Sequence, residues 1–290
     1  MTLLDVAAML HLSWGTVKAI VKKHLAKEYQ RIGYKRVRHI GIDELYLGRK
    51  DKFITLVLDL DTGRIIWVGQ GRGGLALREF WRRLKISGAR LEAVAMDMSG
   101  AYSASVREHA PHAIITFDRF HVIKLMNGRL DQLRRELVAA AGDQAAKQSI
   151  KGMRWLLLKN ALNLSADAKT ALNQSLKANK PLATAYLLKE ELSLLWFMAN
   201  RKQARSFLAQ WCQKAVASGI KQLIAMAKTL TRFAENILHF FVTGLTSAAV
   251  EGTNRKIRTL LRNAYGLRDQ QYLKLRLYSL HESKFKFTGC

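Results

Sequence analysis

The chain has 290 residues, more than one compact domain usually contains, so we expect a core domain with an inserted or appended part. Its 48 Lys and Arg against 22 Asp and Glu give a formal net charge of +26, which favours nucleic acid as the partner. The sequence has neither a signal peptide nor an apolar run of about 18 residues, so no membrane is expected and the cytoplasm is favoured. Two cysteines are too few for a disulfide framework or a Cys-based zinc site.

Residues 1–30 are predicted to form a partial helix-turn-helix segment that binds DNA. The apolar pattern of residues 5–25 breaks near Ser13, which can cap the second helix. Lys18, Lys22 and Lys23 lie off the apolar face of that helix, so they are candidates for phosphate contacts. An ordinary helical hairpin with a solvated basic face fits this short pattern equally well.

Five extended segments follow, and they predict the fold class. Three come in succession, and the Asp61-Thr62-Gly63 turn should make the second and third an antiparallel hairpin. Two further strands alternate with helical segments. The segments are HIGIDELYL from 39, FITLVLDLD from 53, RIIWVGQG from 64, LEAVAMD from 91 and AIITFD from 113. This order predicts an α/β fold with a mixed five-stranded sheet of the ribonuclease H-like type, whose first part is residues 36–122.

Residues 123–235 lack strand patterning and repeat apolar positions at helical spacing, which predicts an all-helical insertion domain. Within it, Trp155, Trp196 and Trp211 are expected to be core anchors rather than surfaces for base stacking. Residues 236–290 should return to the core with one helix, a break at Tyr265-Gly266 and a second, basic helix.

Two aspartates follow apolar runs on predicted strands. Asp43 follows Ile40-Gly41-Ile42, and Asp97 follows Val94-Ala95-Met96. Taken singly, such an aspartate is more often a helix cap or a turn residue. In a ribonuclease H-like sheet, however, the first and fourth strands are parallel neighbours, so the two carboxylates should emerge side by side. Like charges at that spacing repel unless cations hold them together.

Glu251 is an acid within a basic helical segment. Alone, it would be interpreted as a first-turn residue that the helix dipole favours. If this helix docks across the sheet, Glu251 meets the two aspartates. Three carboxylates without an obvious Ser, His or Cys nucleophile suit two Mg²⁺ ions, with Mn²⁺ as a substitute. The neighbouring basic residues are candidates for DNA binding: Arg255, Lys256 and Arg258.

From Lys35 to about Tyr278 the chain resembles bacterial insertion-sequence transposases of the ISL3 family. The matching segments are GIDE at 41–44, DMSGAY at 97–102, FDRFHV at 117–122, KGMRWLLLKN at 151–160, VEGTNRKIR at 250–258 and RNAYGLRD at 262–269. The resemblance implies a DDE transposase that cleaves element ends and joins them to target DNA. It also implies that Asp43, Asp97 and Glu251 are the metal-binding triad and that the protein is a homo-oligomer, a dimer when assembled on DNA.

Asp118 and His121 fit an Asp-x-x-His element of similar transposases. His121 would then be catalytic near the scissile phosphate, or else a structural histidine, and the two interpretations are evenly balanced. The nearby acids Glu44, Asp59 and Asp61 are assigned to turn or surface.

The chain departs from the family pattern in two ways. Family members usually begin with a zinc-binding module and a complete helix-turn-helix, whereas this sequence starts partway through the latter. Ser247 also stands where an asparagine is expected. Two alternatives therefore stay open: a truncated, catalytically impaired DNA-binding regulator of transposition, and a ribonuclease H-like nuclease.

Overall fold

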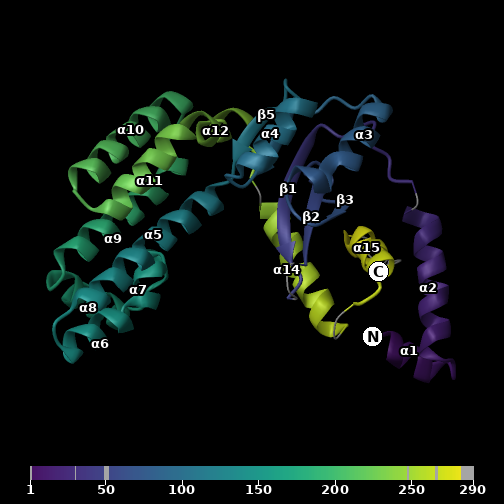
Figure 1. Cartoon of the computed structure of the whole chain (residues 1–290), viewed down its shortest axis with the longest axis horizontal. Helices are drawn as coiled ribbons and strands as arrows, with labels where there is room; N and C mark the ends of the chain where they lie inside the picture. Colours follow the sequence, from purple (N-terminus) through teal and green to yellow (C-terminus); the bar gives the residue numbers. More distant parts are fainter. Residues whose placement is uncertain (1, 30, 49–51, 247, 265–266, 282–290) are drawn as a thin grey trace, which may run out of the picture. The chain divides into compact units, whose positions relative to one another are not determined.

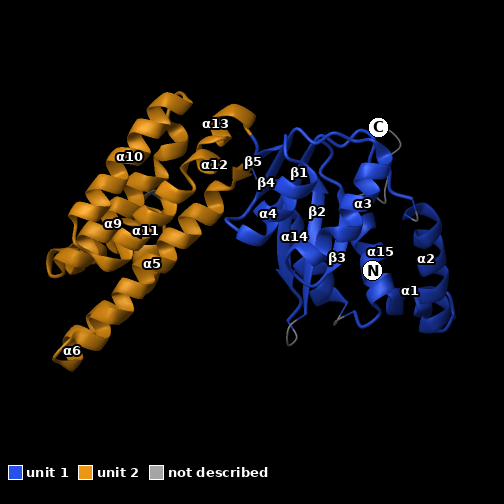
Figure 2. Cartoon of the chain, turned by 45° about the horizontal axis from the view of Figure 1, so that its top comes forward, with its two compact units in different colours: residues 1–115, 245–290 blue, residues 116–244 orange. Residues whose placement is uncertain are grey.

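A computed structural model describes residues 2–29, 31–48, 52–246, 248–264 and 267–281. The chain divides into two compact units, which Figure 2 colours separately. Unit 1 contains residues 1–115 and 245–290, and unit 2 contains residues 116–244. The predicted insertion, residues 123–235, lies within unit 2. The units are described one at a time.

The sheet has five strands in the order β3-β2-β1-β4-β5 (Figure 1). The strands are β1 (His39–Tyr46), β2 (Phe53–Asp59), β3 (Ile65–Gln70), β4 (Ala93–Met96) and β5 (Ile114–Phe117). β1 pairs with β2 and β2 with β3 in antiparallel fashion, while β1 and β4 are parallel. The β2–β3 hairpin turns at Gly63, whose φ of 71° is one that L side chains rarely adopt. The predicted ribonuclease H-like mixed sheet is therefore confirmed.

Helices cover both faces of this sheet. One face packs against α14 (Ala248–Asn263) and α15 (Gln270–Tyr278) through a cluster that includes Leu56, Leu58, Ile257, Leu273 and Leu277. The other face meets α3 (Arg78–Ser87) and α4 (Gly100–His109), preceded by the short helix η1 (Gly74–Leu77). Strand residues alternate between the two faces. Consecutive residues of β1 therefore contact helices on opposite faces of the sheet.

The helix α14 lies alongside β1 in a defined register. A Cβ atom on Gly41 would lie 2.5 Å from Cγ2 of Val250, so these two positions are in close approach. Further along, Asn254 Nδ2 donates to Asp43 Oδ2 at 2.5 Å. Four residues of helix rise about 6 Å, and two residues of strand span roughly 6.6 Å. Between these two contacts α14 and β1 therefore advance by nearly the same distance, and they run in the same direction.

Two helices precede the sheet, α1 (Leu3–Met9) and α2 (Trp14–Tyr29). They are separated at the predicted break, and Ser13 Oγ accepts from the backbone N–H of Thr16 at 3.0 Å. No single helix in the described ranges is long and apolar enough to cross a bilayer. Only α1 and α2 taken together, with a 115° bend between them, meet that test of length and composition.

Apart from the end of β5, the described part of unit 2 contains only helices and their connections. They are α5 (Arg119–Ala140), α6 (Gln144–Gly152), α7 (Arg154–Leu158), η2 (Ala161–Asn163), α8 (Ala166–Lys177), α9 (Lys180–Ser193), η3 (Leu195–Phe197), α10 (Arg201–Ala217), α11 (Lys221–Arg232), α12 (Ala234–Leu238) and α13 (Phe240–Thr243). Trp211 and Trp196 are buried as predicted, and Trp211 Nε1 donates to the carbonyl of Leu188 at 2.8 Å.

The prediction that Trp155 is a core anchor is wrong, because its side chain is 67% exposed. Met153, which directly precedes α7, and Leu157 within it are both buried, and they lie four residues apart on one face of the chain. A residue midway between them points about 200° away from Met153 at 3.6 residues per turn. Trp155 therefore faces outward.

The contact between Gly41 and Val250 yields a stability prediction. Gly41→Ala should lower the free energy of unfolding by about 1–3 kcal/mol, because the added methyl overpacks a β-branched side chain that has little freedom to move. Adding Val250→Ala makes room for that methyl, so the double variant should lose less than the sum of the two single losses. Urea unfolding of all four proteins measures this coupling. Additive losses would show that the two positions do not touch.

Candidate active site

Asp43 and Asp97 occupy neighbouring positions beside two parallel strands: Asp43 lies within β1, which continues to Tyr46, and Asp97 directly follows β4. The β1–β4 pairing runs to Ile42 opposite Met96, and each aspartate is the next residue of its segment. Residues at matched positions of adjacent strands project from the same face. Asp43 is half-buried and accepts hydrogen bonds at both oxygens, from the backbone N–H of Glu44 at 2.8 Å and from Asn254. The predicted adjacency of the first and fourth strands is confirmed.

Glu251 lies on one flank of α14, and the opposite flank is buried. Thr253 on the buried flank pairs with His281 Nε2 at 3.2 Å, in the short helix η4 (Ser279–His281) that follows α15. Burial lowers the pKa of His281, with a further contribution from nearby Lys256 and Arg64. At 100° per residue, Glu251 points to the other side of the helix axis from Thr253. Because Thr253 meets η4 and α15 packs on β3, we expect the Glu251 flank to face β4 and Asp97.

The Glu251 carboxylate is 43% exposed and pairs with Arg255 at 3.2 Å, one helical turn away. No three His, Cys, Asp or Glu side chains in the described ranges are grouped closely enough to hold a metal ion. Even so, two neighbouring aspartates and a glutamate on the adjacent helix flank supply the hard oxygen donors that divalent cations such as Mg²⁺ prefer. The residues present therefore fit a divalent cation by their chemistry, although Glu251 is engaged with Arg255.

Asn254 is a site residue that the sequence interpretation missed. It is 7% exposed, and its Nδ2 contacts Asp43 Oδ2 at 2.5 Å. Because an ionised carboxylate only accepts hydrogen bonds, the amide nitrogen must face Asp43. Its Oδ1 is buried, with no hydrogen-bond partner among the described residues. The available signal was its spacing, four residues after Val250 and hence on the face of α14 that meets the sheet.

Glu44 was assigned to turn or surface, and that assignment is wrong. Strand alternation turns its side chain to the face opposite Asp43, where it accepts from Tyr102 Oη at 2.6 Å. The same hydroxyl contacts Thr55 Oγ1 at 2.9 Å and accepts from Gly73 N–H at 3.1 Å. Burial raises the pKa of Tyr102, and the hydrogen bond to Glu44 raises it further. This network ties the segment GIDE to the segment DMSGAY.

The other two nearby acids have the expected local roles. Asp59 accepts from the backbone N–H of Asp61 at 3.1 Å and from Thr62 Oγ1 at 2.7 Å, which stabilises the hairpin turn. Asp61 Oδ1 lies 2.7 Å from His39 Nδ1. None of these contacts brings the side chain of Asp59 or Asp61 to Asp43 or Asp97.

Asp118 and His121 form a local pair at the start of α5, in unit 2. His121 Nδ1 lies 3.3 Å from Asp118 Oδ2. Asp118 is buried and His121 is half-buried. The pairing agrees with the structural interpretation of His121, while a contact with DNA stays a prediction.

The basic candidates divide into two groups. Lys18 and Lys22 lie 3.1 and 3.0 Å from Asp269 Oδ2, at the N-terminus of α15. The backbone N–H of Tyr272 lowers the pKa of Asp269, and Lys22 lowers it further. Lys18 and Lys22 thus attach α2 to α15, which favours a structural role over phosphate contact. The exposed candidates are Lys23, Arg255, Lys256 and Arg258.

The family model and the known relatives that match this chain are all transposases. Residues 40–277 match the model of the ISL3 transposase family. The chain is 34% identical over 275 residues to the transposase for insertion sequence element IS1001 of Bordetella parapertussis, covering 94% of this chain and 68% of that protein. It is 30% identical over 292 residues to the transposase for insertion sequence element IS1557 of Mycobacterium tuberculosis, covering 92% and 66%. It therefore spans about two thirds of the length of these relatives.

Among solved structures, the chain is similar to the Drosophila P element transposase strand transfer complex. The TM-score is 0.44 at 10% sequence identity, with 90% of this chain and 81% of that chain covered.

The contact between Asn254 and Asp43 yields a second prediction. Asn254→Ala should lower the free energy of unfolding by about 1–3 kcal/mol, because a hydrogen bond to a charged group is lost. In the presence of chelator, the Asn254→Asp protein should be less stable than the Asn254→Ala protein, since it places a second carboxylate against Asp43. Millimolar Mg²⁺ should restore more stability to Asn254→Asp than to the parent. Thermal unfolding with and without Mg²⁺ measures both effects.

Asn263→Ala is the matched control, because Asn263 is exposed at the end of the same helix. The control should unfold like the parent in both buffers. An Asn254→Asp protein with parent stability in chelator would mean that Asn254 does not hold Asp43 in solution.

Proposed function

The chain belongs to the ISL3 family of DNA transposases, and we propose that it cleaves the ends of an insertion-sequence element and joins them to target DNA at Asp43, Asp97 and Glu251. Two alignments support this assignment of residues, that of β1 with β4 and that of α14 with β1. β1 sets Asp43 beside Asp97, and α14 follows β1 with Glu251 on the flank toward β4. In this proposal, acids from three separate segments converge on the face of the sheet that α14 covers.

Membership of a DDE family implies dependence on a divalent metal. We assign the cation as Mg²⁺, with two ions held by the three carboxylates and Mn²⁺ as a substitute, because these hard oxygen donors suit both metals. When bound, such ions activate an attacking water or 3′-hydroxyl and stabilise the departing oxygen. No side chain of the protein then needs to form a covalent intermediate.

The residues around the triad have separate tasks in this proposal. Asn254 fixes the orientation of Asp43 through its amide N–H groups. On the opposite face of β1, Glu44 and Tyr102 hold the strand to α4, which directly follows Asp97 and its turn. Glu251 exchanges its ion pair with Arg255 for the cation. Because Arg255 is highly exposed, its released guanidinium can bind a DNA phosphate.

DNA binding extends along the exposed face of α14. Lys256 and Arg258 continue the basic surface that begins at Arg255, and Lys23 adds a cation on α2. We also propose that two copies assemble on the DNA, because an element has two ends to be joined together. His121 would contact the DNA near the scissile phosphate. The relatives come from bacteria, whose DNA lies in the cytoplasm, so we place the enzyme there.

The triad is tested by removing one charge at a time. Asp43→Asn, Asp97→Asn and Glu251→Gln keep the shape of each side chain but remove the charge that holds the cation. Each should reduce Mg²⁺-dependent cleavage and joining by about a thousandfold or more, and double variants should lose little beyond that, because ligands of one site act as a unit. The assay joins pre-nicked element ends to a supercoiled plasmid.

Asp59→Asn and Asp61→Asn are matched controls, since these acids stabilise a turn of the same sheet. Both should retain joining near the parent level. Near-parent joining by any triad variant would remove that residue from the site. A parent that nicks DNA without joining it would indicate a nuclease, and one that binds DNA without cutting would indicate a regulator.

The charge of the chain predicts how DNA binding responds to salt. With a net charge of +26, binding to duplex DNA should be mostly electrostatic and weaken steeply as salt rises. For six or more phosphate contacts, affinity should fall on the order of a thousandfold between 50 and 200 mM salt. A filter-binding series on a fixed duplex measures the slope. A nearly flat series would contradict this account of the charge.

A further inference from the structure

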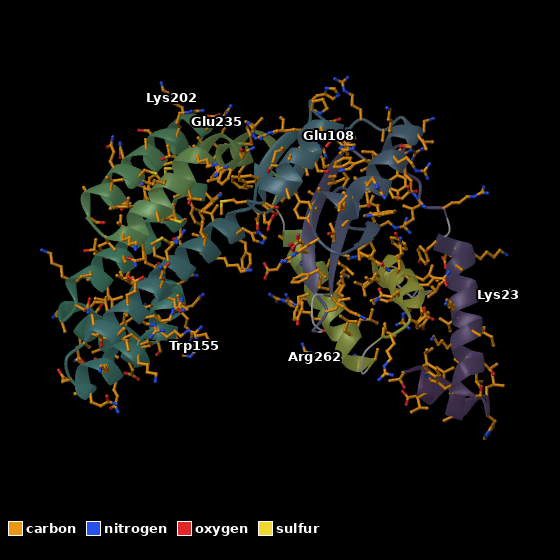
Figure 3. All side chains as sticks on the ribbon, in the orientation of Figure 1. Lys23, Glu108, Trp155, Lys202, Glu235 and Arg262 are labelled. Carbon is orange, nitrogen blue, oxygen red and sulfur yellow. The ribbon has the colours of Figure 1, made fainter. Side chains whose placement is uncertain are left out.

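Trp155 is a large aromatic side chain that the fold displays to solvent. Its neighbours Met153 and Leu157 are buried, and they anchor α7 so that the indole between them points outward. Figure 3 shows Trp155 at the surface of unit 2. In the same unit, Trp196 and Trp211 are both buried. The exposure of Trp155 therefore follows from its place on an anchored helix.

Arg154 lies against this indole and is itself held in place. Its guanidinium carbon is 4.9 Å from the centre of the Trp155 ring, within the range of a cation–π contact. Its Nε lies 3.6 Å from Asp131 Oδ1 on α5, and Asp131 also pairs with Arg134 and Arg135. The ring and the cation beside it thus form one surface feature supported from the long helix α5.

The surroundings of Trp155 are basic. Lys159 is exposed, and its backbone N–H donates to the carbonyl of Trp155 at 3.3 Å, which places it one turn further along the chain. Lys151, at the end of α6, is exposed as well. Residues 150–160 contain three basic residues and no acidic residue. An aromatic face flanked by cations is the combination with which proteins bind nucleic acid strands, by stacking on a base and pairing with adjacent phosphates.

We propose that Trp155 is a stacking platform for an unpaired DNA base, with Lys151, Arg154 and Lys159 binding the flanking phosphates. The proposal rests on the proposed function, because cleavage and joining leave DNA ends and gaps at which bases lose their stacking partners. A base inside intact duplex presents only its edges to a protein, so its face is out of reach of a surface indole. Every base has an aromatic face, so the platform should accept any of the four bases.

The charge also argues against a second copy of this chain as the occupant. Each copy carries +26, and the surface around Trp155 is itself basic, so two such surfaces repel each other. A polyanion relieves that repulsion. DNA therefore fits this surface better than another protomer.

The test compares two DNA ligands of one sequence, an intact duplex and the same duplex with a short single-stranded gap. Trp155→Ala should weaken binding to the gapped duplex about tenfold or more, the size expected for one stacked base, and change binding to the intact duplex less than about twofold. Trp155→Phe should recover most of the gapped-duplex affinity, because it keeps an aromatic face. Phe197→Ala is the matched control, since Phe197 is 77% exposed in the same unit.

A fluorescent base analogue in the gap gives a direct reading. 2-Aminopurine should be quenched when the parent binds and stay bright with Trp155→Ala. Binding is measured in chelator, where no cleavage is needed for the readout, so failure of the catalytic proposal leaves this test intact. Equal losses on both ligands, or quenching that persists without Trp155, would overturn the proposal. A change in sedimentation of Trp155→Ala without a change in gap binding would overturn it in favour of a protein contact.

Discussion

The close approach of α14 to β1 is the constraint on which the candidate active site depends. At Gly41 the strand has no side chain, which lets Val250 of the helix reach the backbone. One helical turn later, Asn254 meets Asp43. Because helix and strand advance by nearly equal distances between these contacts, fixing the first contact also fixes the second. The flank of α14 on which Glu251 lies is then set by the geometry of the helix alone.

β1 also explains why two adjacent acids have different tasks. Alternation along the strand sends Asp43 toward α14 and Glu44 toward α4. Asp43 accepts a hydrogen bond from Asn254 of α14, whereas Glu44 is paired with a buried tyrosine hydroxyl. The hydroxyl lies on α4, which begins three residues beyond Asp97. The segment GIDE therefore contributes twice, through the proposed ligand Asp43 and through the network that holds the strand.

The sequence predicted those features that depend on local pattern. Alternating apolar residues, a tight turn and helical spacing were enough for the five strands, the hairpin, the helical character of unit 2 and the adjacency of the strands that carry Asp43 and precede Asp97. Features that depend on partners distant in sequence escaped: Lys22 pairs with Asp269, Asn254 with Asp43, and Glu44 with Tyr102. Trp155 was misassigned because apolar composition does not reveal which face of a five-residue helix is buried. Two expectations, the substitution at Ser247 and the break at Tyr265-Gly266, fall outside the described residues.

The central claim is that Asp43, Asp97 and Glu251 hold a divalent cation in one place. Anomalous diffraction from crystals of the protein bound to element-end DNA and Mn²⁺ tests it most directly, since the anomalous signal locates the metal without reference to the fold. The account predicts anomalous density between Asp43 and Asp97, with Glu251 turned away from Arg255 and into the coordination sphere. Ordered Mn²⁺ bound elsewhere, or bound at the aspartates while Glu251 keeps its pair with Arg255 in an active complex, would contradict it.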